Sequence, residues 1–83
     1  MMDIKDFKVN CCYRHFKGDL YFVFDVALHT ETNEYMVVYK ALYGDCKTYV
    51  RPYEMFIELA PKRSDNITNQ TYRFEPFEAK GIV

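Results

Sequence analysis

The side chains best suited to chemistry in this chain are one arginine and the tyrosines expected beside it. Tyr39 and Tyr43 precede a Gly-Asp turn and Arg51 follows it, so a hairpin would place rings next to the guanidinium. A guanidinium can hold a carboxylate or a phosphate through two hydrogen bonds and stack on rings at the same time. This arrangement predicts an anion-binding site. The alternative is a structural arginine that lies over the tyrosines and pairs with Asp25 or Glu54.

A second group of candidate residues surrounds a predicted hairpin loop. His29, Glu31 and Glu34 could together bind a metal ion or supply a general base. A metal site usually needs three or four converging ligands, however, and only His15 offers an obvious further ring nitrogen. The structural alternative is that Glu31 or the loop threonines fix a tight turn, and His29 donates a hydrogen bond to one of them. We therefore predict no metal and no other cofactor.

The cysteines, Cys11, Cys12 and Cys46, suggest neither a disulfide framework nor a zinc motif. We expect free thiols, because the number is odd and two of the cysteines are adjacent. Cys46 would be a nucleophile only if His15 or His29 lay beside it, and the spacing does not indicate this. The chain also lacks a Gly-rich phosphate loop, a serine nucleophile elbow and an HExxH motif. No catalytic residue is predicted, and the sequence favours a protein that is not an enzyme.

Length and charge limit the class of protein further. A chain of 83 residues is expected to form one domain over residues 1–83. Its 11 basic and 12 acidic residues give a net charge of −1, which argues against general nucleic-acid binding and against a polybasic membrane anchor. No apolar run approaches the length of a transmembrane helix, and residues 1–10 lack the apolar core of a signal peptide. We predict a cytoplasmic protein without membrane contact.

Alternating apolar residues predict a small, mainly β fold. The expected elements are an alternating segment at 11–17, strands at 20–29, 34–43 and 47–51, a 3₁₀ turn at 52–56, a short strand at 57–60 and a closing edge strand at 72–77. Residues 1–10 form an N-terminal extension, and residues 61–71 form a polar loop that is the best candidate for mobility. This order is that of a five-stranded SH3-like barrel with one 3₁₀ turn. The alternative is an α+β fold with an open antiparallel sheet.

The short polar loop after the first long strand sets the predicted register. A four-residue loop pairs Asp25 with Val38. It also pairs Phe24 with Tyr39, unless a β-bulge shifts the pairs by one residue. The second hairpin turn then places Tyr39 near Arg51.

Several short motifs along the chain are typical of one family. They are Tyr13-Arg14-His15-Phe16-Lys17-Gly18, Ala27 with His29-Thr30-Glu31-Thr32, Val37-Val38-Tyr39, Leu42-Tyr43-Gly44, Val50-Arg51-Pro52, Met55-Phe56 and, after the polar loop, Arg73-Phe74. In this order they resemble the small bacterial family called domain of unknown function 1653 (DUF1653). Members usually carry Trp where this chain has Tyr49, which keeps a large ring at the position. The resemblance implies a common fold and a common surface, and it implies no activity.

These observations predict a non-enzymatic binding module that recognises a peptide, a nucleotide or another anionic ligand. The residues expected to bind it are His15, His29, Tyr39, Tyr43 and Arg51.

Three alternatives belong to other functional classes. The segment 13–17 with Lys40 and Lys47 would suit a barrel that binds single-stranded nucleic acid, although the near-neutral net charge argues against it. A small metal-dependent hydrolase would use the histidine and glutamates around the first hairpin loop. Exposed tyrosines and a free edge strand would also fit a homodimer.

Overall fold

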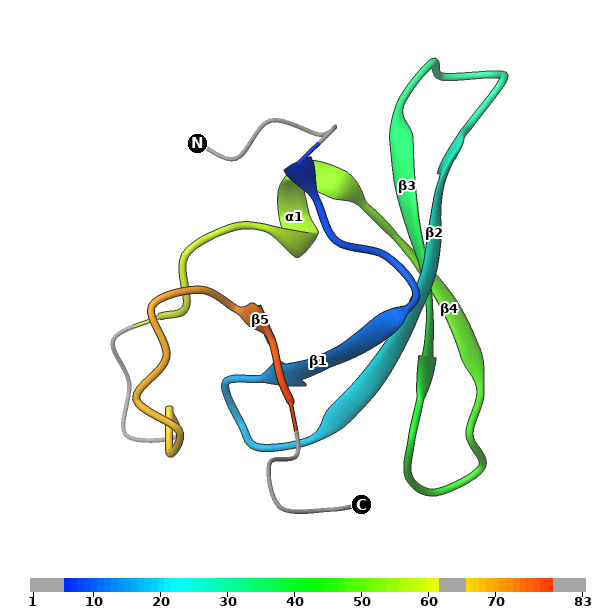
Figure 1. Ribbon diagram of the computed structural model, residues 1–83. Helices are drawn as coiled ribbons and strands as arrows, with labels where there is room; N and C mark the ends of the chain where they lie inside the picture. The colour runs from blue at the N-terminus through cyan, green and yellow to red at the C-terminus, as the bar shows by residue number, and fades with distance from the viewer. Residues whose placement is uncertain (1–5, 62–65, 79–83) are drawn as a thin grey trace.

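Five antiparallel strands form one twisted sheet, and a single-turn helix packs beside it (Figure 1). The computed structural model describes residues 6–61 and 66–78. The elements in chain order are β1 (Cys11–His15), β2 (Leu20–Leu28), β3 (Tyr35–Ala41), β4 (Thr48–Pro52), α1 (Tyr53–Phe56) and β5 (Phe74–Pro76). Their order across the sheet is β4-β3-β2-β1-β5. The fold is therefore mainly β, as the alternating sequence predicts.

The predicted closed SH3-like barrel is wrong, because the sheet is open and has β4 and β5 as its two edges. Closure requires the two end strands to exchange backbone hydrogen bonds. β5 has only three residues, pairs with β1 and ends at Pro76, which has no N–H to donate. β4 ends at Pro52, where the chain turns into α1. The open antiparallel sheet agrees with the alternative prediction, but one helical turn leaves the fold mainly β rather than α+β.

An α-helical turn replaces the predicted 3₁₀ turn. Ile57 donates its backbone N–H to the carbonyl oxygen of Tyr53 at 3.1 Å, which is the four-residue spacing of an α-helix. The short strand predicted at 57–60 is reduced to one isolated bridge between Leu59 and Tyr72. Within the described residues, no helix has the length and apolar character needed to cross a membrane.

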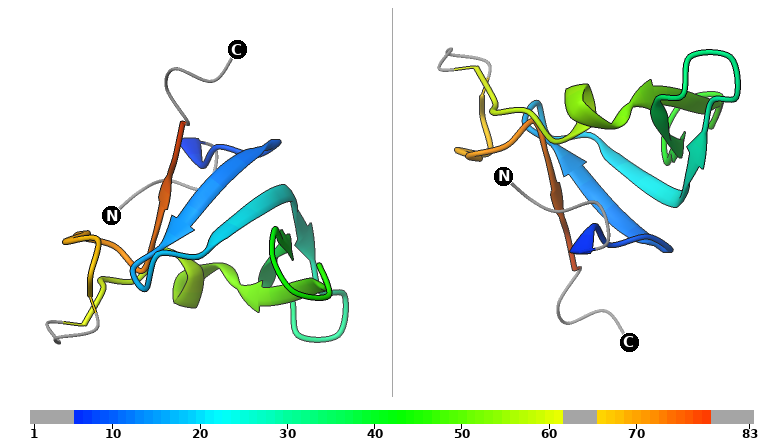
Figure 2. Two further views of the ribbon diagram at one scale, coloured as in Figure 1. Left: turned by 90° about the horizontal axis from the view of Figure 1, so that it is seen from below. Right: turned by 90° about the horizontal axis from the view of Figure 1, so that it is seen from above.

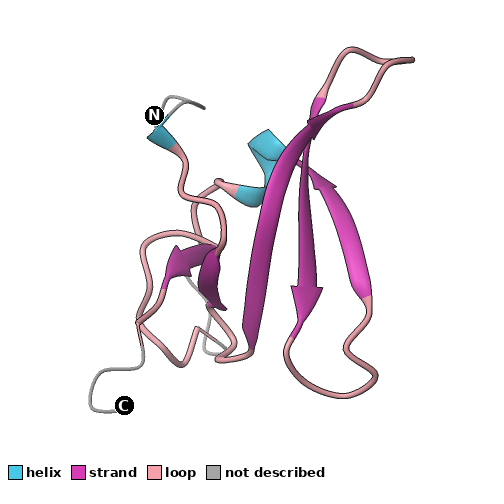
Figure 3. Cartoon of the chain, turned by 45° about the vertical axis from the view of Figure 1, so that its right-hand side comes forward, coloured by secondary structure: helices cyan, strands magenta, loops and turns pink. Residues whose placement is uncertain are grey.

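The hairpin of β2 and β3 contains a bulge that changes the predicted register. Asp25 pairs with Val38 as predicted, but Tyr39 pairs with Val23 instead of Phe24, because the register shifts between Val23 and Asp25. The extra residue, Phe24, is 40% exposed, whereas Val23 is fully buried. The bulge thus keeps a valine in the core and turns a ring outward. The loop of this long hairpin projects at one end of the sheet, away from the pair formed by β1 and β5 (Figures 2 and 3).

Large rings fill the core between the sheet and α1. The core residues are Phe7, Tyr13, Val23, Val37, Tyr39, Tyr53, Phe56 and Phe74. Phe56 of α1 and Phe74 of β5 stack with their ring centroids 4.1 Å apart. Phe7, from the predicted N-terminal extension, lies 5.7 Å from Phe56 and 5.5 Å from Tyr13 between centroids. Segments that are far apart in the sequence therefore meet in one small aromatic core.

The described part of the predicted polar loop, residues 66–71, is attached to β1 through a buried side chain. Gln70 is buried, donates from Nε2 to the carbonyl oxygen of Arg14 at 2.9 Å, and accepts from Arg14 Nε at 2.8 Å. The hydroxyl of Thr68 donates to the carbonyl oxygen of Phe16. These bonds do not fit the expectation of a mobile loop for residues 66–71, and residues 62–65 lie outside the described part of the chain.

Candidate functional site

The structure brings the predicted arginine and its neighbouring tyrosine into contact. Arg51 on β4 pairs with Val37 on β3, so its side chain lies on the same face of the sheet as that of Tyr39. Arg51 Nε donates to the hydroxyl of Tyr39 at 3.3 Å. The guanidinium carbon lies 5.7 Å from the centroid of the Phe74 ring, within the range of a cation–π contact. Arg51 is thus half-buried against rings, as the sequence predicts.

The structural alternative for Arg51 required a carboxylate partner, and the described residues supply none. Neither Asp25 nor Glu54 forms an ion pair with it; Asp25 Oδ1 instead accepts the N–H of Val26 at 2.8 Å. The Nε–H bond to Tyr39 uses one of the five N–H donors of a guanidinium. The remaining donors are therefore open to water or to a ligand from solution.

Tyr21 connects the other residues around Arg51, although the sequence analysis did not select it. Its ring centroid lies 5.5 Å from each of the rings of Tyr39, Tyr43 and Phe74. The hydroxyls of Tyr21 and Tyr43 share a hydrogen bond of 2.5 Å. Burial, and after it this hydrogen bond, raises the pKa of Tyr21. Tyr43 is 45% exposed and forms part of the outer rim.

His15 lies at the end of β1 and contacts the same rings. Its centroid is 4.9 Å from that of Phe74 and 6.4 Å from that of Tyr21. Burial, then the positive charges of Arg73, Lys17 and Arg51, lowers the pKa of His15 from 6.5 to about 4, against a smaller opposing effect of Asp19. His15 is therefore neutral at pH 7. Since Nδ1 accepts the N–H of Lys17 at 3.1 Å, Nε2 carries the proton and can donate.

We call the group formed by Arg51, Tyr39, Tyr43, Tyr21, His15 and Phe74 the Arg51 surface. It gathers four of the five predicted ligand-binding residues.

His29, the fifth predicted residue, lies elsewhere. It follows the far end of β2, about 25 Å along the strand from Tyr21 at roughly 3.3 Å per residue. Its Nδ1 accepts the backbone N–H groups of Glu31 at 3.2 Å and Thr32 at 3.3 Å. These contacts resemble the structural alternative, except that His29 accepts instead of donating. No three His, Cys, Asp or Glu residues in the described part of the chain converge to hold a metal ion.

The basic and aromatic patch considered for nucleic acid does not form one surface. Tyr13 and Phe16 are each only 2% exposed, so their faces are not available to stack on bases. Lys40 pairs with Phe22 and Thr48 and alternates with buried Tyr39, so it lies on the opposite face of the sheet from Arg51.

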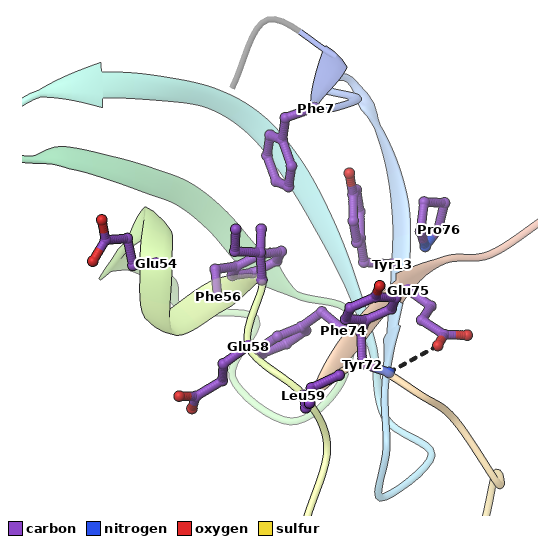
Figure 4. Close-up of a pocket in the computed structure, with 11 residues that line it drawn as sticks. Phe7, Tyr13, Glu54, Phe56, Glu58, Leu59, Tyr72, Phe74, Glu75 and Pro76 are labelled. Atoms are coloured by element: carbon purple, nitrogen blue, oxygen red, sulfur yellow. Dashed lines mark hydrogen bonds between the residues drawn. The ribbon is translucent and has the colours of Figure 1, made fainter. Parts of the chain in front are cut away.

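A cavity of about 490 Å³ lies against the aromatic core and shares Phe74 with the Arg51 surface (Figure 4). We call it the apolar cavity. Its lining residues are Phe7, Tyr13, Glu54, Phe56, Ile57, Glu58, Leu59, Tyr72, Phe74, Glu75 and Pro76. The sequence analysis did not find it. Its walls come from three separate segments of the chain. The one signal in the sequence that could have indicated it is the apolar character of Ile57, Leu59 and Tyr72, which flank a polar loop.

Comparison with known proteins identifies the family. Residues 11–76 match the family described as "Protein of unknown function (DUF1653)". The chain belongs to the DUF1653 family. It is similar to a DUF1653 protein of Bordetella bronchiseptica whose crystal structure is known, with 29% identity over 88% of this chain and 90% of the other, and a TM-score of 0.73. No curated protein matches the chain.

The DUF1653 match confirms the resemblance carried by the sequence motifs, from Tyr13 to Arg73-Phe74. All residues of the Arg51 surface, from His15 to Phe74, lie within the matched range. Phe7, which lines the apolar cavity, lies before it. The family description names no activity, so function has to be argued from the chemistry of these two regions.

Proposed function

We propose that this DUF1653 protein is a non-enzymatic module that binds an anionic ligand, such as an acidic peptide or a nucleotide, on the Arg51 surface. The observation that carries the proposal is a half-buried guanidinium, packed against rings, with no carboxylate partner among the described residues. A buried or half-buried charge without a counter-ion is costly, and a bound anion would remove that cost.

The arrangement of side chains supports one mode of binding. The hydroxyl of Tyr39 and the ring of Phe74 fix the guanidinium plane, so less side-chain entropy is lost when a ligand binds. A carboxylate or phosphate would accept two parallel hydrogen bonds from the free N–H groups of Arg51. The exposed rings of Tyr43 and Tyr49 would cover the rest of the ligand.

The electrostatic environment supports the same sign of ligand charge. The pKa of His15 is lowered in part by Arg73, Lys17 and Arg51, so the potential near its ring is positive. Because neutral His15 can donate from Nε2, it would add a hydrogen bond to an anion without carrying charge itself.

The test is a backbone-amide NMR titration at low ionic strength with inorganic phosphate, AMP and a short acidic peptide. We expect at least one of them to shift resonances around Tyr39, Tyr43 and Arg51. Arg51→Gln should weaken that binding by at least about tenfold, since a charge-assisted bidentate contact contributes roughly 1.5–3 kcal/mol.

Lys47→Gln is the matched control, because it removes one positive charge from the exposed turn before β4. It should reduce affinity by less than about threefold through long-range electrostatics alone. Thermal unfolding of each variant checks that the fold is intact. Equal binding by wild type and a folded Arg51→Gln variant, or no binding of any anion by wild type, would overturn the proposal.

A further inference from the structure

The apolar cavity has a shape and a lining that suit a side chain from a binding partner. Its volume of about 490 Å³ lies in the range of ligand pockets, roughly 300–1,000 Å³. Phe7, Phe56 and Phe74 form its inner walls and are buried. Leu59 and Tyr72 line it and are 65% and 47% exposed, so large apolar groups remain in contact with water at its mouth. Such an exposed apolar site is typical of an interaction surface.

Among the residues that the structure describes, the charged ones that line the apolar cavity are all acidic. Glu75 accepts the backbone N–H groups of Thr71 and Tyr72, each at 2.9 Å, and Glu58 forms an ion pair with Arg73 at 2.7 Å. Glu54 is exposed and has no ion-pair partner among the described residues. The charge at the rim is therefore negative, which favours a cationic partner.

A second, smaller cavity extends the acidic region across α1. It has a volume of about 340 Å³ and is lined by Glu54 together with Glu34 of the β2–β3 hairpin, and by no basic residue among those that the structure describes. Glu54 thus lines both cavities and connects their acidic rims.

The carboxylates point away from the rings, so an occupant must make its apolar contacts and its ionic contacts in different places. Figure 4 shows the side chains of Glu54 and Glu58 directed away from the ring of Phe7, toward the outside of the cavity. A small organic cation seated among the rings would not reach them. An occupant that contacts both the rings and the carboxylates needs an apolar group inside the cavity and cationic groups outside it. Consecutive residues of a peptide provide this arrangement.

From this geometry we propose that the apolar cavity docks a basic peptide segment of a partner protein. One large apolar side chain enters the cavity past Leu59 and Tyr72 and packs against the ring of Phe56, and flanking lysine or arginine side chains lie along Glu54. This site is separate from the proposed anion-binding site, because it shares only the Phe74 ring with the Arg51 surface and favours the opposite ligand charge.

The experiment uses three synthetic peptides and isothermal calorimetry on the full chain. One peptide carries phenylalanine between two pairs of lysines, the second replaces phenylalanine with alanine, and the third replaces the lysines with glutamates. We expect the first peptide to bind, the second to bind at least about tenfold more weakly, and the third to show no binding.

Binding measurements on variants show where on the protein the peptide binds. Leu59→Asp puts a charge at the cavity mouth and should weaken binding of the first peptide at least about tenfold. Val50→Asp is its control, since Val50 is 61% exposed and alternates with Arg51 on β4, so it lies on the opposite face of the sheet. Glu54→Gln should weaken binding about threefold, against no change for Glu31→Gln at the far hairpin loop.

Several outcomes would overturn this proposal. Equal affinity for the phenylalanine and alanine peptides would show that charge alone attracts them, and unchanged binding by Leu59→Asp would place the peptide elsewhere. Binding that appears only after removal of residues 79–83 would assign the cavity to the chain itself. Arg51→Gln should bind the basic peptide with the same affinity as wild type. The anion proposal is therefore tested by phosphate binding and this one by peptide binding, and each can fail without the other.

Discussion

The Arg51 surface and the apolar cavity share one ring, Phe74, and differ in almost everything else. The Arg51 surface carries the positive charge of Arg51, and its tyrosines and His15 surround the Phe74 ring on or beside a regular sheet. The apolar cavity has an acidic rim and is built from Phe7 and Tyr13, from α1 with the residues after it, and from the region of β5. One small aromatic core thus supports two surfaces of opposite charge.

The two regions differ in whether their residues come from neighbouring strands or from segments that are far apart in the sequence. Tyr21, Tyr39 and Arg51 lie on three consecutive strands connected by short turns, so strand register alone brings them together. The cavity depends on Phe7 meeting Phe56 and Phe74, which no short turn enforces. We therefore expect the Arg51 surface to tolerate changes in the core better than the cavity does.

Phe74→Ala should have the largest effect, because Phe74 is the wall between the two regions. Its buried ring stacks on Phe56 and contacts His15, Tyr21 and Tyr39. Truncating a buried phenylalanine costs about 3–5 kcal/mol of unfolding free energy, a large share of the stability of a domain this small. Urea denaturation followed by circular dichroism measures the loss.

Phe24→Ala is the matched control for this prediction. Phe24 is 40% exposed at the bulge, so its truncation should cost less than about 1 kcal/mol. Phe74→Leu should keep the fold and permit binding measurements. It should weaken binding of the basic peptide more than binding of phosphate. A Phe74→Ala protein as stable as Phe24→Ala would show that the two regions do not depend on a common core.

The fold could be predicted from the sequence where the pattern is local. The alternation of apolar residues placed β2 and β3 to within a few residues, and the loop length predicted the pair Asp25–Val38. The bulge at Phe24 could not be placed, because both faces of that stretch are apolar. Barrel closure was wrong because it depends on contacts between β4 and β5, which lie at the two ends of the sheet.

The candidate site, too, could be predicted only where contacts are set by residues close together in the sequence. The contact of Arg51 with Tyr39 could be predicted, because a hairpin turn sets their spacing. His29 was grouped with them on residue type, but it follows the far end of the long strand β2. The edge strand that contains Phe74 was predicted at 72–77, but the contact of Phe74 with Arg51 was not, since a short strand after a polar loop does not show which strand it pairs with. The apolar cavity was missed for the same physical reason.

Acidification should test whether burial, and after it the neighbouring cations, depresses the pKa of His15 in the folded protein. The folded-state pKa of His15 is lowered to about 4 from 6.5, so between these values the unfolded chain binds more protons than the folded one. His15 therefore stabilises the fold fully above about pH 6.5, and that contribution is lost as the pH falls toward 4. Because the ring is only half-buried, we expect a loss on the order of 1 kcal/mol.

The pH effect is isolated by comparing variants, since carboxylates also titrate near pH 4. Urea midpoints of His15→Gln should fall less between pH 6.5 and pH 4 than those of wild type, whereas His29→Gln should retain the wild-type dependence. Phosphate bound at Arg51 should raise the pKa of His15, observable by imidazole NMR. A wild-type profile in His15→Gln would show that the pKa of His15 is not lowered by folding, and the electrostatic support for the anion site would be lost.

Tyr43→Phe should have the smallest effect and separates the rim of the Arg51 surface from its centre. The variant loses the hydrogen bond to Tyr21 but keeps both rings, so its stability should fall by only about 0.5 kcal/mol. The pKa of Tyr21 should fall but stay above 10, because burial is its largest cause and the hydrogen bond comes second. Ring-carbon NMR across the alkaline range measures this. Phosphate affinity should change less than about threefold, since the guanidinium supplies the charge. A loss as large as that of Arg51→Gln would instead place the hydroxyl pair of Tyr21 and Tyr43 at the centre of the anion site, and the guanidinium would then serve to hold the rings.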